Sequence, residues 1–358
     1  MINLALVSLI IPTYNERENI NELIERLEAI KLDLEIVIVD DNSPDKTAEE
    51  VEKLASIYNN IKVIKRRGKL GLGSAVSDGI KHASGNYIAV MDADLQHPPE
   101  KLIDLYVYLE NGADIVIASR YVNGGAIEGW SVYRNLISRG AIFIAHILLP
   151  ETKDINDLLS GFFAFKRESI KDLELSTRSY KVLLELLHPT RSSNIRIVEV
   201  PFVFGARKRG KSKLSSNEIL RYLSLVLKLN EYRVMKYMSV GAIGTLVNEG
   251  VLYSLVERGL NPFYVSPLAI EISILTNHAL NHIWTFKMRG SKKLKGYLSS
   301  LIKYHVGIAL GAIINYVTLA TLMPLRIHYL IANFLGIIFG FIFNYLFSEH
   351  IAWRQRAL

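Results

Sequence analysis

Four long apolar stretches in the second half of the chain constrain its fold more than any other feature of the sequence. Each is near the ~20 residues that an α-helix needs to cross a bilayer, and they occupy residues 237–256, 263–286, 298–322 and 329–347. A soluble helical domain with a very apolar core is the alternative. The preferred interpretation is an all-α domain of four transmembrane helices, attached to a first half of different composition.

The basic residues around these stretches indicate their orientation. Lysines and arginines gather before the first stretch, between the second and third, and after the fourth, whereas the other two connections carry only Arg258 and Arg326. Positive charge marks the cytosolic side of membrane helices. The sequence therefore predicts that both termini and the N-terminal half lie in the cytosol. The net charge of +7 fits an anionic membrane surface, and nucleic acid is not an expected partner.

Polar residues interrupt the first two apolar stretches. The first carries Asn248 and Glu249, and the second carries Glu271, Asn277 and His278. Ionisable groups at such depth are functional candidates, but hydrogen bonds between helices explain them equally well. The glycines of these stretches indicate close helix packing. No cysteine is present, which excludes disulfides, thiolate metal sites and cysteine nucleophiles.

Strand-like and helix-like segments alternate through residues 4–91 of the first half. This alternation predicts a mostly parallel sheet, in which ligands bind beyond the carboxyl ends of the strands. Polar groups follow the four predicted strands, at residues 12–16, 40–45, 66–73 and 92–99. The glycine loop among them matches neither a Walker P-loop nor a dinucleotide fingerprint, so ATPases and dehydrogenases lose support.

Asp92 and Asp94 follow the apolar residues 87–91 and are the strongest candidates for chemistry. Two carboxylates one residue apart at the end of a buried strand are costly unless something pairs them. A divalent cation that holds a diphosphate would pair them, because Mg²⁺ and Mn²⁺ prefer oxygen ligands. A solvated loop or a helix cap is the simpler alternative, since Asp and Pro also begin helices.

A series of motifs in the first 230 residues resembles the inverting glycosyltransferases of family 2 with a GT-A fold, in the polyprenyl-phosphate sugar synthase group. In family order they are residues 12–16, 40–43, 68–73, 92–98 and 119–121, Arg134 with 138–140, Asp157 with 160–162, and 210–214. Two departures are Leu158-Leu159, where the family usually has a proline, and the three basic residues 207–209. The last part of the chain resembles, more loosely, a GtrA-like membrane domain.

The resemblance implies three parts and a set of site residues. The parts are an α/β, Rossmann-like GT-A domain in residues 1–216, an amphipathic interface helix in 217–235, and the GtrA-like domain in 236–358. A divalent cation (Mg²⁺ or Mn²⁺) would be held by Asp92, Asp94 and Gln96. The donor nucleotide would contact Pro12, Tyr14, Glu16, Asp41, Asp92, Ala93, Arg207, Arg209 and Lys213. The acceptor phosphate would contact Arg120, Arg134 and Ser138, and the catalytic residues would be Asp94, Arg120 and Arg134.

The implied reaction transfers a sugar, with inversion, from a nucleoside diphosphate sugar to a polyprenyl phosphate at the cytosolic face of a bilayer. Mannose from GDP-mannose and a dolichyl acceptor are preferred, and glucose from UDP-glucose or a flippase-linked transferase are alternatives. The acceptor phosphate, with a second pKa of ~6, needs no strong general base. A polysaccharide synthase would carry a Gln-x-x-Arg-Trp motif, which this sequence lacks, and a soluble nucleotidyltransferase would lack the apolar stretches.

Overall fold

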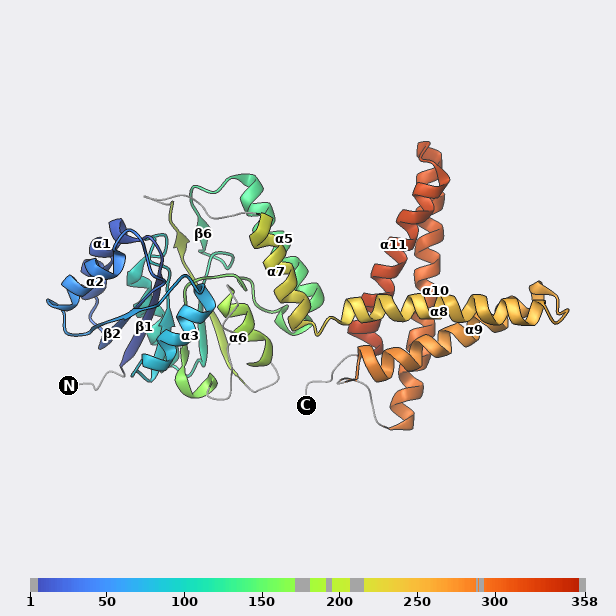
Figure 1. Cartoon of the computed structure of the whole chain (residues 1–358), viewed down its shortest axis with the longest axis horizontal. Coiled ribbons are helices and arrows are strands. Elements are labelled where there is room, and N and C mark those ends of the chain that lie inside the picture. The colour runs from blue at the N-terminus through green and yellow to red at the C-terminus, as the bar shows by residue number, and fades with distance from the viewer. Residues whose placement is uncertain are drawn as a thin grey trace. The chain divides into compact units, whose positions relative to one another are not determined.

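The computed structural model describes residues 6–170, 181–190, 195–206, 216–287, 289 and 293–353. The chain forms two compact units, Met1–Leu229 and Asn230–Leu358, which are described separately (Figure 1). Arg207, Arg209 and Lys213, three of the expected donor-binding residues, lie outside the described residues.

The first unit is built on a seven-stranded sheet with the order β3-β2-β1-β4-β7-β5-β8. The strand β7 is antiparallel to both of its neighbours, and the other pairs are parallel. Two further short strands, β6 (Ala126–Ile127) and β9 (Val203–Phe204), pair with each other. The strands of the large sheet are β1 (Val7–Thr13), β2 (Leu34–Asp40), β3 (Ile61–Lys65), β4 (Tyr87–Val90), β5 (Ile115–Ser119), β7 (Phe163–Lys166) and β8 (Ile197–Pro201).

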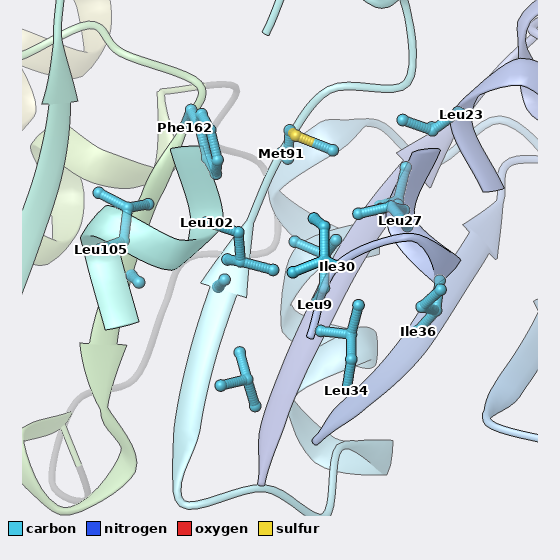
Figure 2. Packing of buried hydrophobic residues seen from close by; sticks show 14 of the residues in the cluster. Leu9, Leu23, Leu27, Ile30, Leu34, Ile36, Met91, Leu102, Leu105 and Phe162 are labelled. Carbon is cyan, nitrogen blue, oxygen red and sulfur yellow. The ribbon is translucent and has the colours of Figure 1, made fainter. Parts of the chain in front are cut away.

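Helices cover both faces of this sheet and enclose two apolar cores. One core packs α1 and α4 on the sheet through residues such as Leu23 and Leu102, and Figure 2 shows part of it. The other core uses α3, α5, α6 and α7, for example Val76 and Leu184. The helices are α1 (Arg17–Glu28), α2 (Thr47–Ala55), α3 (Leu72–His82), α4 (Leu102–Glu110), α5 (Val132–Leu148), α6 (Val182–Thr190) and α7 (Ser216–Leu229), with short turns η1 (Pro99–Lys101), η2 (Pro150–Thr152) and η3 (Arg167–Ile170).

The sheet confirms the predicted α/β architecture of the first half. Strands that are buried on both faces are nearly continuous apolar runs. All seven residues of β2 are buried, and its only charged residues, Glu35 and Asp40, stand near its two ends. Because β2, β1 and β4 are parallel neighbours, the loops after them meet at one edge of the sheet. This edge carries the polar residues that the sequence placed beyond the strand ends.

The second unit consists of helices that pack in pairs, α8 (Arg233–Val256) against α9 (Pro262–Leu280) and α10 (Leu294–Leu322) against α11 (Tyr329–Phe347) (Figure 1). Two π-helical turns, η4 (Asn281–Thr285) and η6 (Ser348–Ala352), continue α9 and α11, and a 3₁₀ turn, η5 (Met323–Leu325), follows α10. Within the described residues, three segments are long and apolar enough to cross a membrane: Arg233–Val256, Leu294–Leu325 and Phe334–Ala352. The region of α9, expected as the second span, is not among them; it contains Pro267 and Glu271.

Six glycines of the apolar stretches were expected at close helix contacts, and five of them lie there. The six are Gly241, Gly244, Gly307, Gly311, Gly336 and Gly340. At Gly244 and Gly311 an added Cβ would lie 2.2 and 2.1 Å from an asparagine side chain of the partner helix, and Gly307, Gly336 and Gly340 are similarly enclosed. Gly241 is the exception, with no atom within 4 Å of such a Cβ. The polar residues also make interhelical contacts: His278 bonds to Ser300 at 2.9 Å and Glu271 to His305 at 3.1 Å. These contacts favour the structural explanation of the polar residues.

Candidate active site

The loop after β4 brings Asp92, Asp94 and Gln96 together. The Asp92 side chain is 41% exposed, whereas Asp94 and Gln96 are buried. Leu95 between them has a φ of +60°, a left-handed conformation that is uncommon for a leucine and that turns the chain within the loop. The Gln96 backbone N–H donates to Asp94 Oδ1 at 3.2 Å, and its side-chain amide donates to the Gly205 carbonyl at 2.9 Å. The loop is therefore held by one hydrogen bond within itself and by one to the segment around Gly205.

Gly161 leaves room for the Asp92 carboxylate. A Cβ at Gly161 would lie 2.6 Å from Asp92 Oδ2, so only glycine fits this position without a shift. On the other side of the carboxylate, Nδ1 of the buried His97 lies 4.0 Å away. Burial lowers the pKa of His97 to about 4, so its ring is neutral near pH 7. The rings of Phe162 and Phe204 surround it.

This loop fits a divalent cation that is shared with a diphosphate. Among the described residues, no group of three or more His, Asp or Glu side chains could hold a metal by itself. Two carboxylates and one amide stand in a five-residue loop, and magnesium is usually bound by one or two carboxylates together with substrate phosphates. The glycine at position 161 leaves the space that the more exposed carboxylate, Asp92, occupies.

Asp41 organises the glycine loop of the same sheet edge. Its carboxylate accepts from Arg66 at 2.5 Å and from the Gly71 backbone N–H at 2.7 Å, and Arg66 also donates to Ser74 at 2.7 Å. Asp41 is 5% exposed. The structure thus gives this residue a role in shaping the loop, which the sequence did not predict beside its expected role in donor binding.

The other expected donor-binding residues lie at the end of β1 and in the loops after β1 and β4. Pro12, Tyr14 and Glu16 are half-buried, and Ala93 is buried between the two aspartates. The ammonium group of Lys69, from the glycine loop, lies 3.8 Å from the centre of the Tyr14 ring. A cation and an aromatic face from two loops therefore meet at the edge where the nucleotide was expected.

Arg120 forms a buried ion pair with Asp157. Its Nε and Nη2 donate to the two carboxylate oxygens, each at 2.7 Å, and its backbone N–H donates to the same group at 2.9 Å. Burial alone would lower the pKa of the Arg120 guanidinium, but Asp157 raises it above its usual value. Asp157 is fully buried and Arg120 is 8% exposed. Arg120 is thus fixed in place before any acceptor binds.

Trp130 links the two arginines that were expected at the acceptor phosphate. The Arg134 guanidinium lies 4.2 Å from the centre of the indole ring and the Arg120 guanidinium 5.3 Å from it. Arg134 stands at the start of α5, where Ser131 caps the helix by accepting from its backbone N–H. One turn later, Ser138 accepts a hydrogen bond of 2.9 Å from the Tyr121 hydroxyl. The structure brings Arg120, Arg134 and Ser138 together through aromatic side chains.

Lys181 is a candidate active-site residue that the sequence did not indicate. It lines a cavity together with Asp92 and Gly161, just before α6. Burial and the nearby Arg120 lower the pKa of Lys181, while Asp92 and Asp157 oppose this change. The Lys181 ammonium group therefore interacts electrostatically with both Asp92 of the aspartate loop and Arg120. A lone lysine in an unremarked segment gives no sequence signal, whereas Trp130 could have been noticed from its position four residues before Arg134.

Comparisons with known proteins identify the family of the chain. Residues 8–174 match the model of glycosyl transferase family 2, and residues 236–355 match that of the GtrA/DPMS transmembrane domain. A dolichol-phosphate mannosyltransferase of Pyrococcus furiosus is 46% identical over 97% of this chain and 99% of its own length. The enzyme of the same name from Saccharomyces cerevisiae is 38% identical over 64% of this chain and 88% of its own length.

A solved structure shows the same fold in the first unit. It is the glucosyl-3-phosphoglycerate synthase of Mycobacterium tuberculosis, in complex with Mn²⁺, UDP-glucose and phosphoglyceric acid. Its TM-score is 0.50 at 20% identity, covering 63% of this chain and 80% of that one. The predicted GT-A architecture is therefore confirmed, and so is the predicted family. The near full-length similarity shows that the chain is a membrane-bound glycosyltransferase of the dolichol-phosphate mannosyltransferase family.

Proposed function

We propose that this protein transfers mannose from GDP-mannose to the phosphate of a polyprenyl phosphate, with dolichyl phosphate as the preferred acceptor and inversion at the sugar. The observation that carries the proposal is the closeness of the aspartate loop to Arg120: the ring of Phe204 lies 5.1 Å from the ring of His97 and 5.5 Å from the Arg120 guanidinium. The aspartate loop suits a cation-bound diphosphate, and the Arg120–Trp130–Arg134 stack suits a second phosphate. The family relationship supports mannose and the lipid acceptor.

In this reaction an oxygen of the acceptor phosphate forms a bond to the anomeric carbon, and the bond from that carbon to the diphosphate breaks. GDP carries away the electron pair. The acceptor phosphate is largely dianionic at neutral pH, because its second pKa is ~6, so no proton has to be removed from it. Within the described residues, the one buried imidazole beside the aspartate loop, His97, is neutral, and the mechanism assigns it no proton transfer.

The guanidinium groups overcome the repulsion between two negatively charged substrates. Arg134 would hold the acceptor phosphate with Ser138, and planar guanidinium groups suit such oxygens. Arg120 is already paired with Asp157, so it would contribute its positive field and orient Arg134 through the shared indole ring. Lys181, which lines a cavity with Asp92, would place its side-chain amine on the donor side.

Asp92, Asp94 and Gln96 would hold the divalent cation, and Pro12, Tyr14, Glu16, Asp41 and Ala93 would form the donor pocket together with Arg207, Arg209 and Lys213. When bound, the cation would neutralise the charge that develops on the departing diphosphate. The rigid aspartate loop would keep these ligands in place before the donor arrives.

The lipid acceptor implies a catalytic unit at a bilayer surface. Exposed apolar side chains on α5 and α7 support this placement, among them Leu136, Phe143 and Leu220, each more than 60% exposed. We propose an interface helix in residues 217–235 and a membrane domain in 236–358. In this topology all four helices α8 to α11 cross the bilayer, with the catalytic unit and both termini in the cytosol. The basic residues around the helices support it.

The test is a comparison of labelled donors. Purified full-length protein would be incubated with a polyprenyl phosphate, Mg²⁺ or Mn²⁺, and labelled GDP-mannose, UDP-glucose or GDP-glucose in turn. We expect only the mannose label to become extractable into organic solvent, and excess EDTA to prevent its transfer. Transfer of glucose from UDP-glucose at a higher rate would contradict the assigned donor.

A further inference from the structure

The two π-helical turns of the second unit stand at equivalent positions of an internal repeat. η4 begins at Asn281 and η6 at Ser348, 67 positions further along, and both contain five residues. The residue after each turn, Phe286 or Trp353, donates its backbone N–H to the first residue of that turn, at 2.8 and 2.9 Å. Such turns are rare in proteins. Two of them with the same length and the same closing hydrogen bond indicate that the two segments are repeats of one structural unit.

The packing of each helix pair repeats with the same spacing. In the first hairpin (residues 233–285) Gly244 packs against Asn277, and in the second hairpin (residues 300–352) Gly311 packs against Asn344. Both members of the second pair lie 67 positions after their counterparts in the first. Each hairpin contains two antiparallel helices and therefore begins and ends on one side of a membrane. Such parallel repeats are related by an axis along the membrane normal.

The contacts between the two hairpins are also equivalent. The Ser348 hydroxyl donates to the Tyr237 hydroxyl at 3.2 Å, and the Asn281 amide donates to the Tyr304 hydroxyl at 3.5 Å. Here Tyr304 is the counterpart of Tyr237, and Ser348 that of Asn281.

Two ring contacts between the hairpins are also equivalent to each other in the repeat. The ring of Tyr237 lies 5.5 Å from that of Tyr345, and the ring of Tyr304 lies 5.7 Å from that of His278, the counterpart of Tyr345. Phe286 and its counterpart Trp353 stack on each other, with centroids 4.6 Å apart and an interplanar angle of 13°. Two equivalent residues contact each other where they lie beside a two-fold axis. The stack of Phe286 on Trp353 therefore indicates that the two hairpins form a pseudo-symmetric pair.

Charged residues break this symmetry at one buried place. Glu349 in the second hairpin is 1% exposed and accepts from Arg233 of the first hairpin at 3.1 and 3.2 Å. Arg289, in the connection after the first hairpin, donates to the same carboxylate at 2.5 Å. At the equivalent positions stand Ser300 for Arg233 and His282 for Glu349.

We propose that the ion cluster of Arg233, Arg289 and Glu349 selects the pairing of hairpins, so that a first hairpin binds a second hairpin and not another first hairpin. Equivalent hairpins could also pair between two copies of the protein. Pairing two first hairpins would place Arg233 beside His282, and pairing two second hairpins would place Glu349 beside Ser300. Either arrangement separates Arg233 from Glu349, and breaking a buried ion pair is strongly unfavourable.

The first experiment replaces Arg233 and Glu349 of the full-length chain by the residues at the equivalent positions of the other hairpin. Copies with two different affinity tags are expressed together, and the fraction that co-purifies in detergent is measured. The variant combines Arg233→Ser with Glu349→His, and the matched control combines Arg258→Ser with Glu257→His in the exposed α8–α9 connection. We expect association between copies to rise severalfold over wild type in the variant and to stay unchanged in the control.

The second experiment divides the ion pair between two copies. One copy carries Glu349→His and keeps Arg233, and the other carries Arg233→Ser and keeps Glu349. Only exchange of hairpins between the copies restores the pair, so the mixed pair should associate more strongly than either copy with itself. If the single variants fold poorly alone, co-expression should restore their yield. The proposal is overturned if the mixed pair shows no preference and no rescue, or if the folded symmetric variant stays at the wild-type level of association.

Discussion

Asp92 and Asp94 have different environments although only Ala93 separates them. Asp92 is partly exposed beside Gly161, whereas Asp94 is buried and accepts from the backbone of Gln96. The sequence predicted the pair as cation ligands from its place after a buried strand. The structure adds that the loop holds the Asp94 carboxylate through a hydrogen bond from the Gln96 backbone N–H.

Asp94→Asn should lower the rate of transfer by about 100-fold or more, because several kcal/mol of charge stabilisation depend on the cation. Asparagine keeps the size of the side chain, so the fold should persist. The measurement is the steady-state rate, together with calorimetric binding of GDP with and without Mg²⁺. The matched control is Asp104→Asn, which changes an exposed aspartate on α4. Cation-dependent GDP binding of wild-type strength in Asp94→Asn would contradict the assignment.

Arg120 and Arg134 should respond differently to substitution. Arg134→Ala should raise the KM for the lipid acceptor or lower kcat by about 10- to 100-fold, the effect of a charge-assisted contact of about 1.5–3 kcal/mol. Its nucleotide affinity should change little. Arg120→Ala should instead destabilise the first unit by about 3–5 kcal/mol, because it leaves the fully buried Asp157 unpaired.

Thermal unfolding and acceptor kinetics of the two arginine variants separate these roles. A stable Arg120→Ala protein with a defect only in acceptor binding would show that Arg120 acts directly on the phosphate. A collapse of GDP affinity in Arg134→Ala would show that this arginine belongs to the donor site.

Not every site residue could be predicted from the sequence. Short motifs identify the aspartate loop because its residues are adjacent in the chain. Lys181 stands 87 residues beyond Asp94, and only the packing of α6 brings it near that loop. The pairing of Arg120 with Asp157 is likewise a contact between loops that are distant in the sequence. The sequence therefore predicted that the Arg120 guanidinium would bind the acceptor phosphate, whereas the structure shows it in an ion pair with Asp157.

At the scale of elements, Glu35 joins several strands at the edge of the sheet opposite the proposed site. Its carboxylate accepts from Ser8 on β1, from Lys62 on β3, and from the backbone and hydroxyl of Ser84 before β4. Burial raises the pKa of Glu35, but these hydrogen bonds outweigh burial and lower it to about 2. The ionised carboxylate therefore stabilises the order of the strands.

The stability contributed by Glu35 should depend on pH. Because its pKa is lower in the folded state, the contribution is present above the ordinary pKa of glutamate, near 4.5, and is lost as the pH falls toward 2. The shift corresponds to about 3 kcal/mol at neutral pH. Glu35→Gln should lower the thermal stability of the first unit at pH 7, with a difference from wild type that shrinks below pH 4.5. Exposed Glu52→Gln is the control, and a pH-independent difference would contradict the account.

The predicted strands and helices before residue 92 correspond to observed elements because buried parallel strands are continuous apolar runs, which the sequence displays. Beyond that point β7 returns antiparallel between β4 and β5. No local pattern reveals such a reversal. The repeat in the second unit was missed for a similar reason, since the two hairpins share few identical residues and the similarity lies in their contacts.

At the scale of the whole molecule, the proposed donor, cation and acceptor residues all belong to the first unit. A chain that ends after Leu229 should therefore bind GDP with the full-length affinity. It should also transfer mannose to a short, detergent-soluble polyprenyl phosphate. With long lipids its efficiency should fall, because the membrane helices no longer raise the local concentration of the acceptor.

The measurement for this truncation is kcat/KM with short and long acceptors, alongside calorimetric GDP binding. Full-length Glu271→Gln and His278→Ala should keep transfer to the short acceptor. If either loses it while the fold is intact, the membrane helices take part in the reaction.

The central claim is that one mannosyl group moves from GDP-mannose to a lipid phosphate. It is tested most directly by isolating the lipid product of the purified enzyme and determining its mass, its anomeric configuration by NMR, and the GDP released per product. The account predicts a polyprenyl phosphate carrying a single mannose in the β configuration, with one GDP released for each molecule formed. A product with several sugars, the α configuration, or GDP release without a lipid product would contradict it.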